Sequence, residues 1–357
     1  MILLNPGPVT LSPRVRQALA AEELCHREPE FAALTSDVLR RLEQVYECGA
    51  DYAAVLLTGS GTCAVEAMLC TLAPRDRTTL VLCNGVYGER MLEMLKRQGN
   101  PVRALAGPWT DPLDPEAVRR ELAARPEIAS VAAVHLETTT GRLNRLDEIA
   151  ELCRSRGASL LIDAVSSFGG EDLPLERWQP AALAATASKC LHGVPGISFV
   201  LARRDALGAN DGTARSLYLD LRAYHREQAN GWSPYTQAVQ VVHALREALR
   251  ELAEEGGWRA RRSAYLARTT RVRDALRARG IAPIIPPEDC ASMLSAFAIP
   301  EGDSYARLHD ALKQRGYIIY AGQGTLAGRI FRIATMGSIG DDDMSRLVEA
   351  LREVLRC

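Results

Sequence analysis

Residues 159–170 read SLLIDAVSSFGG, and this stretch decides the fold class. The run Ser159–Asp163 is apolar up to its last residue, a carboxylate that is followed by small residues and glycines. A helix pattern, Asp147–Arg156, comes directly before it, with Asp147 as the expected N-cap and Gly157 as the expected end. Apolar strands that alternate with helices indicate a mostly parallel sheet covered by helices on both faces.

Similar strand patterns occur on both sides of this stretch and predict an α/β domain followed by a smaller domain. The other apolar strand candidates of the first domain are Ala53–Leu57, Thr79–Cys83, Val131–His135 and Gly196–Ala202. From about residue 233 to 278 the pattern is helical and rich in Arg and Glu, with a break at Gly256–Gly257. Shorter strand signals at Ser292–Ile299, Tyr317–Tyr320 and Arg329–Ala334 alternate with helix patterns near 303–315 and 342–355. We predict a large domain over 1–240, with an N-terminal arm over 1–20, and a small α+β domain over 241–357.

The composition is that of a globular enzyme and narrows the function classes. The 357 residues carry 43 basic and 44 acidic side chains, and a net charge of −1 gives no electrostatic footprint for nucleic acid or an anionic membrane. No apolar run approaches the roughly 20 residues that span a bilayer, and the N-terminus does not read as a secretory signal. Nine scattered cysteines without a C-x-x-C pair argue against a disulfide framework and a zinc ribbon. We therefore expect a cytoplasmic enzyme with no metal site and no nucleic-acid or membrane partner.

A glycine-rich turn follows the first of these strand candidates. Gly59-Ser60-Gly61-Thr62 leads from the strand into a helix, where glycines let the backbone approach an anion and the helix N-terminus offers free N–H groups. This pattern predicts a phosphate site, with a simple tight turn as the alternative. A dinucleotide fingerprint is disfavoured because Leu82-Cys83-Asn84, and not an acidic residue, ends the next strand. The turn has no lysine after its second glycine, which excludes a P-loop.

Two ionisable residues lie in apolar or glycine-rich surroundings. Asp163 ends its strand at the edge where parallel sheets bind ligands, and its burial would require a positive partner. Lys189 lies among small residues and glycines, surroundings that lower the pKa of a lysine and suit a Schiff base. The alternatives are a surface aspartate that caps the next helix and a solvated surface lysine. The spacing between the two residues is what favours a shared site.

Taken together, these features resemble the class V aminotransferases, which are pyridoxal-phosphate enzymes of fold type I. The resemblance covers nearly the whole chain and is carried by Asn5–Val9, His26–Phe31, Leu57–Thr62, Gly85–Arg90, His135–Gly141, Asp163–Gly170, Ser188–Gly196 and Arg332–Ala334. It implies a large domain with a mostly parallel, seven-stranded sheet, a pyridoxal 5′-phosphate cofactor, and an amino donor and a 2-oxo acid as substrates. Within the family, the Glu-Thr-Thr-Thr-Gly and Lys-Cys-x-x-Gly-Val-Pro-Gly runs are most similar to the branch that interconverts 2-aminoethylphosphonate and pyruvate with phosphonoacetaldehyde and L-alanine.

The resemblance also implies roles for individual residues. Lys189 would hold the cofactor covalently and then transfer the proton at the substrate carbon, and Asp163 would pair with the ring nitrogen. The other positions that match cofactor-binding residues of the family are Ser60, Gly61, Thr62, Tyr87, Thr138 and Ser188. Arg332 and Gly7 match positions that bind substrate, and Arg332 would clamp its acidic group.

One position departs from the family. Relatives usually carry a threonine two residues before a proline, which the neighbouring subunit supplies to the cofactor phosphate, whereas this chain has Trp232 there. Either Ser233 or Thr236 replaces that hydroxyl, or the contact is altered. The resemblance implies a homodimer in which a loop, Tyr224–Thr236, reaches across to the other subunit. Alternative functions are an alanine– or serine–glyoxylate aminotransferase, a pyridoxal-phosphate lyase, a catalytically dead relative, which Lys189 argues against, and a nucleotide-binding module.

Overall fold

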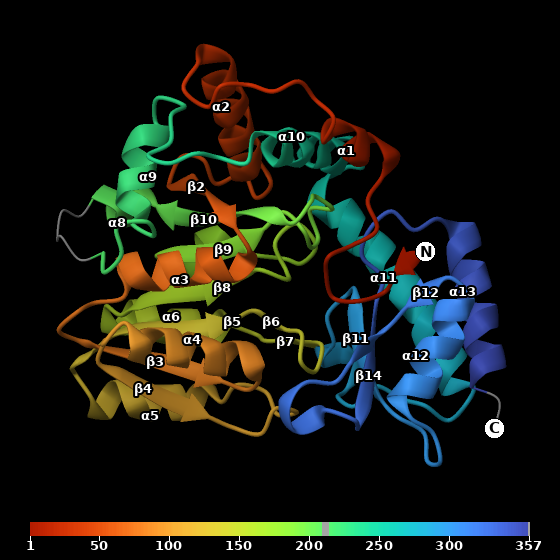
Figure 1. Cartoon of the computed structure of the whole chain (residues 1–357). Helices are drawn as coiled ribbons and strands as arrows, with labels where there is room; N and C mark the ends of the chain where they lie inside the picture. The colour runs from red at the N-terminus through yellow and green to blue at the C-terminus, as the bar shows by residue number, and fades with distance from the viewer. Residues whose placement is uncertain (209–213, 356–357) are drawn as a thin grey trace.

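The large sheet of the molecule has seven strands and dominates the computed structural model (Figure 1), which describes residues 1–208 and 214–355. Its strand order is β2-β10-β9-β8-β5-β3-β4, and β10 runs antiparallel to both of its neighbours, while the other pairs are parallel. The strands are β2 (Tyr52–Gly59), β3 (Thr78–Cys83), β4 (Val102–Ala106), β5 (Ile128–Val134), β8 (Ser159–Asp163), β9 (Ala182–Thr186) and β10 (Gly196–Arg203). The predicted α/β class with a mostly parallel sheet is confirmed.

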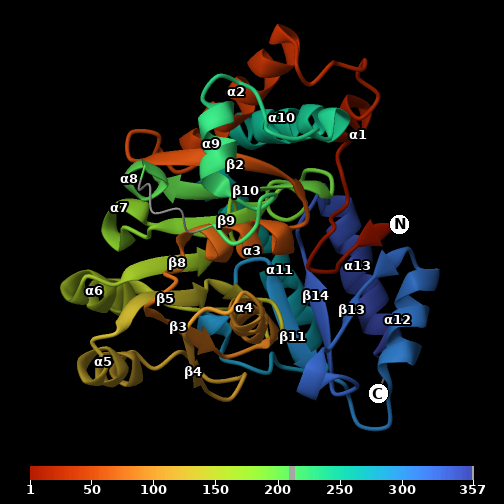
Figure 2. The same ribbon diagram turned by 60° about the vertical axis from the view of Figure 1, so that its left-hand side comes forward.

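Apolar side chains point alternately to the two faces of this sheet, so each face packs against its own layer of helices. In β5, Val131 and Ala133 belong to one core cluster, whereas Ala132 and Val134 belong to the other. A strand that is apolar on both faces must be covered on both. The first layer consists of α2 (Pro29–Gln44), α5 (Pro115–Ala124), α6 (Asp147–Arg156) and α10 (Val239–Glu254). The second consists of α3 (Gly61–Leu72), α4 (Val86–Arg97), α8 (Arg204–Gly208) and α9 (Leu221–Gln228), with α3 and α4 in front of the sheet in Figure 2.

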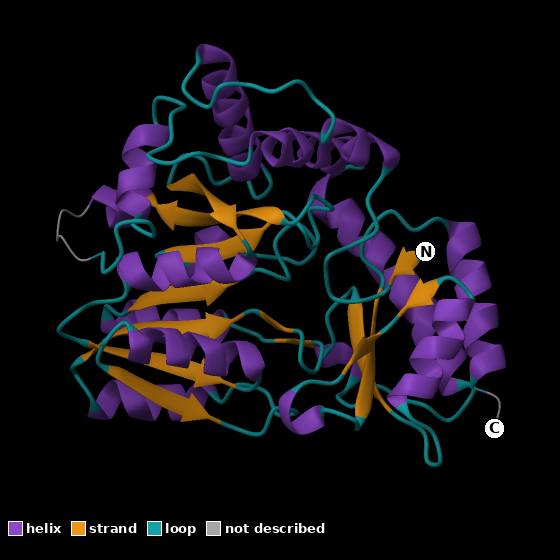
Figure 3. Ribbon diagram, in the orientation of Figure 1, coloured by secondary structure: helices purple, strands orange, loops and turns teal. Residues whose placement is uncertain are grey.

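A smaller antiparallel sheet faces the carboxyl ends of the large-sheet strands other than β10, which runs the opposite way (Figure 3). Its order is β11 (Leu294–Ala298), β14 (Ile330–Ala334) and β13 (Tyr320–Ala321). The helices α11 (Gly257–Arg277), α12 (Tyr305–Gln314) and α13 (Asp341–Val354) pack with it around a separate apolar core. The N-terminal strand β1 (Ile2–Leu3) pairs in parallel with β12 (Tyr317–Ile318), so the start of the chain lies on the side of the small sheet.

A short hairpin connects the two sheets. Its strands, β6 (Leu136–Glu137) and β7 (Arg142–Leu143), follow β5 directly and lie between the large sheet and β11 in Figure 1. An isolated bridge joins Arg142 to Cys290, just before β11. The remaining elements are the short helices α1 (Pro13–Ala18) and α7 (Leu175–Trp178) and single 3₁₀ turns at Pro287–Asp289 and Gly324–Leu326.

The elements around the deciding stretch have the predicted bounds. β8 spans Ser159–Asp163 and α6 spans Asp147–Arg156, and Gly157 ends that helix in the left-handed region with a φ of 63°. The break at Gly256–Gly257 separates α10 from α11, as predicted. These predictions hold because they rest on local signals, namely apolar runs and a glycine that adopts a positive φ more readily than other residues.

Some local predictions are wrong because tertiary contacts decide them. Asp147 is not the N-cap of α6: it is the first helical residue, and its carboxylate accepts a hydrogen bond from Trp178 Nε1 and pairs with Arg177. His135 lies outside β5, and its ring Nδ1 lies 2.9 Å from the Ser167 hydroxyl.

Other errors concern the bounds of elements. The predicted strand Tyr317–Tyr320 is two strands, because β12 pairs with β1 whereas β13 pairs with β14. The predicted loop Tyr224–Thr236 begins inside a helix, since α9 continues to Gln228. β4 is a strand that the apolar pattern missed, because it lies at the sheet edge with exposed positions such as Arg103.

The two helices on either side of the Gly256–Gly257 break pack against different parts of the fold. α10 packs against α2 and α1, whereas α11 contributes to the core beneath the small sheet. The division of the chain at 240/241 stays a prediction. Among the described residues, no helix is long and apolar enough to cross a membrane. The eight cysteines within the described ranges are free thiols, and Cys357 lies outside these ranges.

The large-sheet core should be sensitive to truncation of Phe199, which is fully buried in β10 and packs edge-on against Phe168 at 4.9 Å between ring centres. We expect Phe199→Ala to lower the free energy of unfolding by about 3–5 kcal/mol, measured by urea denaturation. Leu266→Ala is the control, because Leu266 is exposed on the surface of α11, and its loss should be well below that of Phe199→Ala. Similar losses for the two variants would contradict this core assignment.

Candidate active site

The predicted site residues gather where the carboxyl ends of the central strands face the small sheet. Asp163 is the last residue of β8, and Lys189 follows the end of β9 at Thr186. Gly59 is the last residue of β2, and Gly61 begins α3. Parallel strands bring their carboxyl ends to one edge of a sheet, which is where open α/β sheets bind their ligands.

Asp163 is a buried carboxylate that has no ion-pair partner within 1–208 and 214–355. The residue is 7% exposed, and its Oδ1 accepts a hydrogen bond from the Val165 N–H at 2.9 Å. Burial raises the pKa of Asp163 to about 6, while the Val165 N–H and the positive charges of Arg90 and Lys189 oppose this shift. A ligand that brings a positive charge to this carboxylate would relieve the cost of burying it.

Lys189 extends from the loop after β9 towards the N-terminal segment. Its Nζ donates a hydrogen bond to the backbone carbonyl of Pro6. Burial lowers the pKa of Lys189 to about 8, while the neighbouring Cys190 and Asp163 oppose this shift. A large fraction of this amine is therefore neutral, and thus nucleophilic, near pH 8. Gly7 has a φ of 108°, and a Cβ there would overlap the Lys189 side chain, so only glycine fits beside the lysine.

Buried hydrogen bonds connect the loop that carries Lys189 to α11 and to the segment that follows β14. Arg261, on α11, donates from Nη1 to the Cys190 carbonyl at 2.8 Å. The Gly337 N–H donates to His192 Nε2 at 2.9 Å, and the Tyr265 hydroxyl lies 2.5 Å from the same nitrogen. Burial holds the pKa of His192 well below its usual range, in line with a neutral ring whose Nε2 accepts the Gly337 N–H.

The turn between β2 and α3 forms a cradle for an anion. Ser60 is the N-cap of α3 and is exposed, and its side chain makes no capping hydrogen bond. A Cβ at Gly61 would lie 2.6 Å from Val165 Cγ1, so a larger residue would push the start of the helix away from the segment after Asp163. The helix N-terminus and the hydroxyls of Ser60 and Thr62 together offer the donors that a phosphate group needs.

Tyr87 and Arg90 extend this cradle from α4. The Arg90 guanidinium lies 4.8 Å from the centre of the Tyr87 ring and donates from Nη1 to Thr62 Oγ1 at 3.4 Å. These three residues and Asp163 are among the residues that line one small cavity. Sequence reasoning missed Arg90 as a site residue, although its place three residues after Tyr87 puts the two side chains on one helix face.

Thr138 and Arg332 bring the hairpin and the small sheet into the site. Arg332 is fully buried in β14 and donates from Nη1 to the Thr138 carbonyl at 2.7 Å and from Nε to the Ala321 carbonyl at 2.9 Å. The Tyr320 ring lies 4.8 Å from its guanidinium carbon, and no carboxylate of the described ranges pairs with it. Thr138 Oγ1 is buried and has no hydrogen-bond partner among the described residues, so it is available to a ligand atom.

The other predicted residues have fewer contacts. Ser188 is half-buried next to Lys189. Trp232 is also half-buried, while Ser233 is buried and accepts a hydrogen bond from Gln237 Nε2 at 2.8 Å. Thr236 is exposed. Of the two hydroxyls that could replace the missing threonine, only that of Thr236 is presented at the surface.

Glu137 is a second residue that sequence reasoning missed. It is fully buried, and burial raises its pKa to about 7, while hydrogen bonds from Thr139 and Tyr87 oppose this shift. Glu137 is next to Thr138 in the run His135–Gly141, and this position was the sequence signal that could have identified it as a site residue. No group of three or more metal-binding side chains occurs in the part of the chain that the structure describes.

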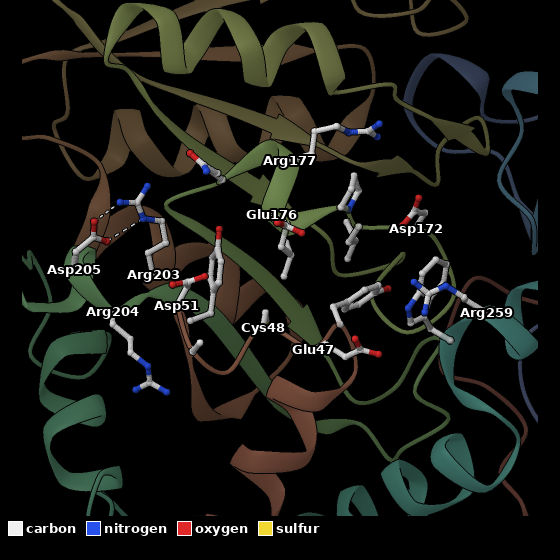
Figure 4. Close-up of a pocket in the computed structure, with 18 residues that line it drawn as sticks. Glu47, Cys48, Asp51, Asp172, Glu176, Arg177, Arg203, Arg204, Asp205 and Arg259 are labelled. Atoms are coloured by element: carbon white, nitrogen blue, oxygen red, sulfur yellow. Dashed lines mark hydrogen bonds and ion pairs between the residues drawn. The ribbon is translucent and has the colours of Figure 1, made fainter.

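A much larger cavity, of about 1200 Å³, lies at the opposite ends of the same strands (Figure 4). It is lined by the start of β2 at Tyr52 and the end of β10 at Arg203, and it contains none of the predicted site residues. Several of its charged side chains already have partners, such as Arg203 with Asp205, which are joined by dashed lines in Figure 4. The predicted residues therefore define a different site, which lies outside this cavity.

The sequence matches a known protein family and curated relatives over nearly its full length. The family model described as aminotransferase class-V matches residues 18–338. The 2-aminoethylphosphonate–pyruvate transaminase of Pseudomonas putida (strain GB-1) is 39% identical, over 99% of this chain and 97% of the relative. The enzyme of the same name from Burkholderia ambifaria (strain MC40-6) is 39% identical, over 99% of this chain and 95% of the relative.

Solved structures share the fold. The alanine–glyoxylate aminotransferase from Nostoc sp. has a TM-score of 0.92 at 28% identity, covering 99% of this chain and 95% of that chain. An aspartate aminotransferase of subgroup IV from Thermus thermophilus has a TM-score of 0.90 at 30% identity, covering 99% of both chains. The predicted architecture is thus confirmed as that of solved aminotransferases.

Lys189 should react with amine-directed reagents at a lower pH than an ordinary lysine. In protein from which any carbonyl compound bound to this amine has been removed, labelling by trinitrobenzenesulfonate should rise through about pH 8, because the pKa of Lys189 is about 8. Mass spectrometry of peptides measures the labelling. Asp163→Asn removes a negative charge that raises this pKa, so the midpoint should move to lower pH. The chain's two other lysines, Lys96 and Lys313, are internal references. An identical pH profile for all three lysines would contradict the assignment.

Proposed function

The chain belongs to the class V aminotransferase family, and from this membership we propose that it interconverts 2-aminoethylphosphonate and pyruvate with phosphonoacetaldehyde and L-alanine. The cofactor of this reaction is pyridoxal 5′-phosphate. The specific substrate pair is supported by the relatives of that name, which are 37–39% identical over 99% of this chain. The predicted roles of individual residues are part of the proposal.

The observation that carries the proposal is the buried guanidinium of Arg332, which has no carboxylate partner in the described ranges. Its Nε and Nη2 donate to the Ala321 carbonyl and its Nη1 to the Thr138 carbonyl. A guanidinium has five N–H groups, so these three bonds leave one N–H on each terminal nitrogen. That pair forms a planar fork that fits two oxygens of one phosphonate or carboxylate. One clamp can therefore serve both half-reactions.

The residues at the strand ends fit pyridoxal phosphate. Ser60, Gly61 and Thr62 form the cradle for its phosphate, and Tyr87 supplies an aromatic face for its ring. Thr138 Oγ1, buried and without a partner, suits the oxygen on that ring. Asp163 lies close enough to Lys189 to act on its pKa, which supports a ring held between the two side chains.

Each side chain then has a definite task. Pyridoxal phosphate supplies an electron sink for a carbon that loses a proton. Lys189 would hold the cofactor through Nζ and would move the proton at the amine-bearing carbon of the substrate. Asp163 would pair with the positive charge of the ring nitrogen and so favour its protonated form. Arg332 orients the substrate by its acidic end, and Gly7 leaves the room that the lysine needs.

Two alternatives use the same residues. An alanine–glyoxylate aminotransferase is supported by the fold of the Nostoc enzyme, at the lower identity of 28%. In that case Arg332 would bind carboxylates alone. A lyase would also fit, because residues that hold the cofactor do not select the bond that breaks. The curated relatives favour transfer to pyruvate over both.

We also propose a cytoplasmic homodimer with active sites that both subunits complete. The exposed residues Leu217 and Tyr218 support an interface, and the Tyr218 ring lies 5.0 Å from that of Tyr235, between ring centres. Tyr235 is next to Thr236, whose exposed hydroxyl is available to a second subunit. The same proposal includes the division into domains at 240/241.

The role of Asp163 can be tested with its isosteric amide. We expect Asp163→Asn to keep bound cofactor, because the phosphate and lysine contacts remain, but to lose transamination by roughly a hundredfold or more. Visible absorbance measures cofactor content, and alanine release measures turnover. Asp172→Asn, at an exposed aspartate, is the control and should match the wild type. Near wild-type turnover in Asp163→Asn would refute this role.

Substrate choice can be tested with Arg332→Lys and a panel of amino donors against pyruvate. Lysine keeps the charge but loses the fork, so kcat/KM for both 2-aminoethylphosphonate and pyruvate should fall roughly 10- to 100-fold, or about 1–3 kcal/mol. Arg329→Lys, at an exposed arginine of the same segment, is the matched control. If the wild-type protein uses alanine with glyoxylate and ignores 2-aminoethylphosphonate, the proposed substrate is wrong and the family assignment stands.

A further inference from the structure

Helix α4 does not provide its own N-terminal cap. Its N-cap residue, Gly85, has no side chain, and the N–H groups of the first helical residues have no partner within the helix. Their acceptors come instead from the β6–β7 hairpin. The Val86 N–H donates to Thr139 Oγ1 at 3.3 Å, and the Tyr87 N–H donates to Glu137 Oε2 at 3.3 Å.

Glu137 and Thr139 form one connected network at this helix end. Glu137 Oε1 accepts hydrogen bonds from the Thr139 N–H at 3.1 Å and from the Thr139 hydroxyl at 2.5 Å. Because that hydroxyl donates to Glu137, its oxygen is free to accept from Val86. A carboxylate at a helix N-terminus is also favoured by the helix dipole. The carboxylate thus accepts three hydrogen bonds, of which one fixes Tyr87.

Thr138, which lies between Glu137 and Thr139 in the chain, connects the same network to the proposed substrate clamp, Arg332. Thr138 accepts a hydrogen bond from Arg332 at its carbonyl oxygen, at 2.7 Å, and its own hydroxyl is buried without a partner. The negative charge of Glu137 also raises the pKa of Arg332, against the lowering effect of burial. Tyr87, Thr138 and Arg332 therefore depend on one short stretch of the hairpin.

The helix end and the hairpin are packed as closely as the backbone allows. A Cβ at Gly85 would lie 2.6 Å from Glu137 Oε2 and closer still to the carboxyl carbon. The φ of Gly85 is 168°, an extended conformation that any residue adopts. Gly85 is therefore required because a side chain there would collide with the Glu137 carboxylate, and not because of its backbone angles.

We propose that Glu137 is a positioning residue of the transamination site, which caps α4 from the hairpin and so sets Tyr87, Thr138 and Arg332 in register with one another. It contacts neither the cofactor nor the substrate in this role. The ring-stacking side chain, the hydroxyl beside the ring and the anion clamp come from three separate elements, and Glu137 joins two of them directly and the third through Thr138. The inference rests on the proposed function for the tasks of these three residues.

Glu137→Gln in the holoenzyme tests the proposal. Glutamine keeps the size of the side chain, but its amide NH₂ would face the Tyr87 N–H, so two donors would oppose each other. We expect full cofactor content, a changed visible circular dichroism band, which reports the tilt of the bound ring, and kcat/KM lower by roughly 10- to 100-fold, as expected for a misplaced site. The loss should appear with both the amino donor and pyruvate.

Glu171→Gln is the matched control. Glu171 is likewise fully buried, and its carboxylate accepts hydrogen bonds from the Ser292 N–H at 2.6 Å and from Arg262 Nε at 3.0 Å. The chemical change is therefore the same, but none of its partners is a proposed site residue. We expect this variant to lose thermal stability while its visible circular dichroism and kcat/KM stay within about twofold of the wild type.

Gly85→Ala disturbs the contact between Glu137 and the start of α4 from the helix side, and it changes no charge. Its Cβ would displace the Glu137 carboxylate, so the circular dichroism band should change as in Glu137→Gln. In a Glu137→Ala background the collision disappears, and the added effect of Gly85→Ala should become smaller. This double-mutant comparison tests the contact even if Glu137→Gln folds poorly.

The outcomes separate the two proposals. Wild-type circular dichroism and kcat/KM in both Glu137→Gln and Gly85→Ala would overturn the positioning role. So would a loss of thermal stability alone, as in Glu171→Gln, because that would make Glu137 merely structural. If the wild-type enzyme does not use 2-aminoethylphosphonate, the substrate proposal fails, and the same variants are then compared with the amino donor that it does use.

Discussion

The burial of two opposite charges at one sheet edge is the constraint on which the rest of the structure depends. Desolvation raises the pKa of Asp163 to about 6 and lowers that of Lys189 to about 8, and each charge partly offsets the shift of the other. Groups in this state cost free energy in the folded protein. A bound group that carries a positive ring nitrogen and reacts with an amine would relieve both costs, which is why the two residues favour a pyridoxal-phosphate site.

Around Asp163 and Lys189, glycines allow backbone segments to pack closely against neighbouring side chains. Gly61 lets the start of α3 lie against the segment that follows Asp163, and Gly85 lets the start of α4 lie against Glu137. At Gly7 the positive φ and the nearness of the Lys189 side chain both exclude a larger residue. The first turns of the two helices both contribute to the lining of one small cavity, through Thr62 and Tyr87.

The residues of the proposed site come from two sheets, the large, mostly parallel sheet and the small antiparallel sheet. The large parallel sheet contributes its strand ends, whose positions follow from the topology, and these hold Asp163 and Lys189. The small antiparallel sheet contributes Arg332 from the middle of β14. The β6–β7 hairpin lies between them, and the hydrogen bond from Arg332 to the Thr138 carbonyl fixes how the two sheets meet at the site. In the proposed function, the side chains that would hold the cofactor and the Arg332 clamp that would hold the substrate lie mainly on different sheets, and the β6–β7 hairpin lies between them.

The sequence by itself determined the α/β class and the bounds of β8 and α6, and it predicted Asp163 and Lys189 as residues of the proposed site, because each of these depends on a local signal. An apolar run that ends in Asp163 and a lysine among small residues can be identified without knowing their neighbours in space. Only the tertiary structure decided the edge strand β4, the separation of β12 from β13, and the places of Arg90 and Glu137. The Glu137 contact with Tyr87 spans 50 residues of sequence, and the Arg332 contact with Thr138 spans 194. Such contacts are set by the packing of whole elements, and a residue's own sequence neighbours contain no signal for them.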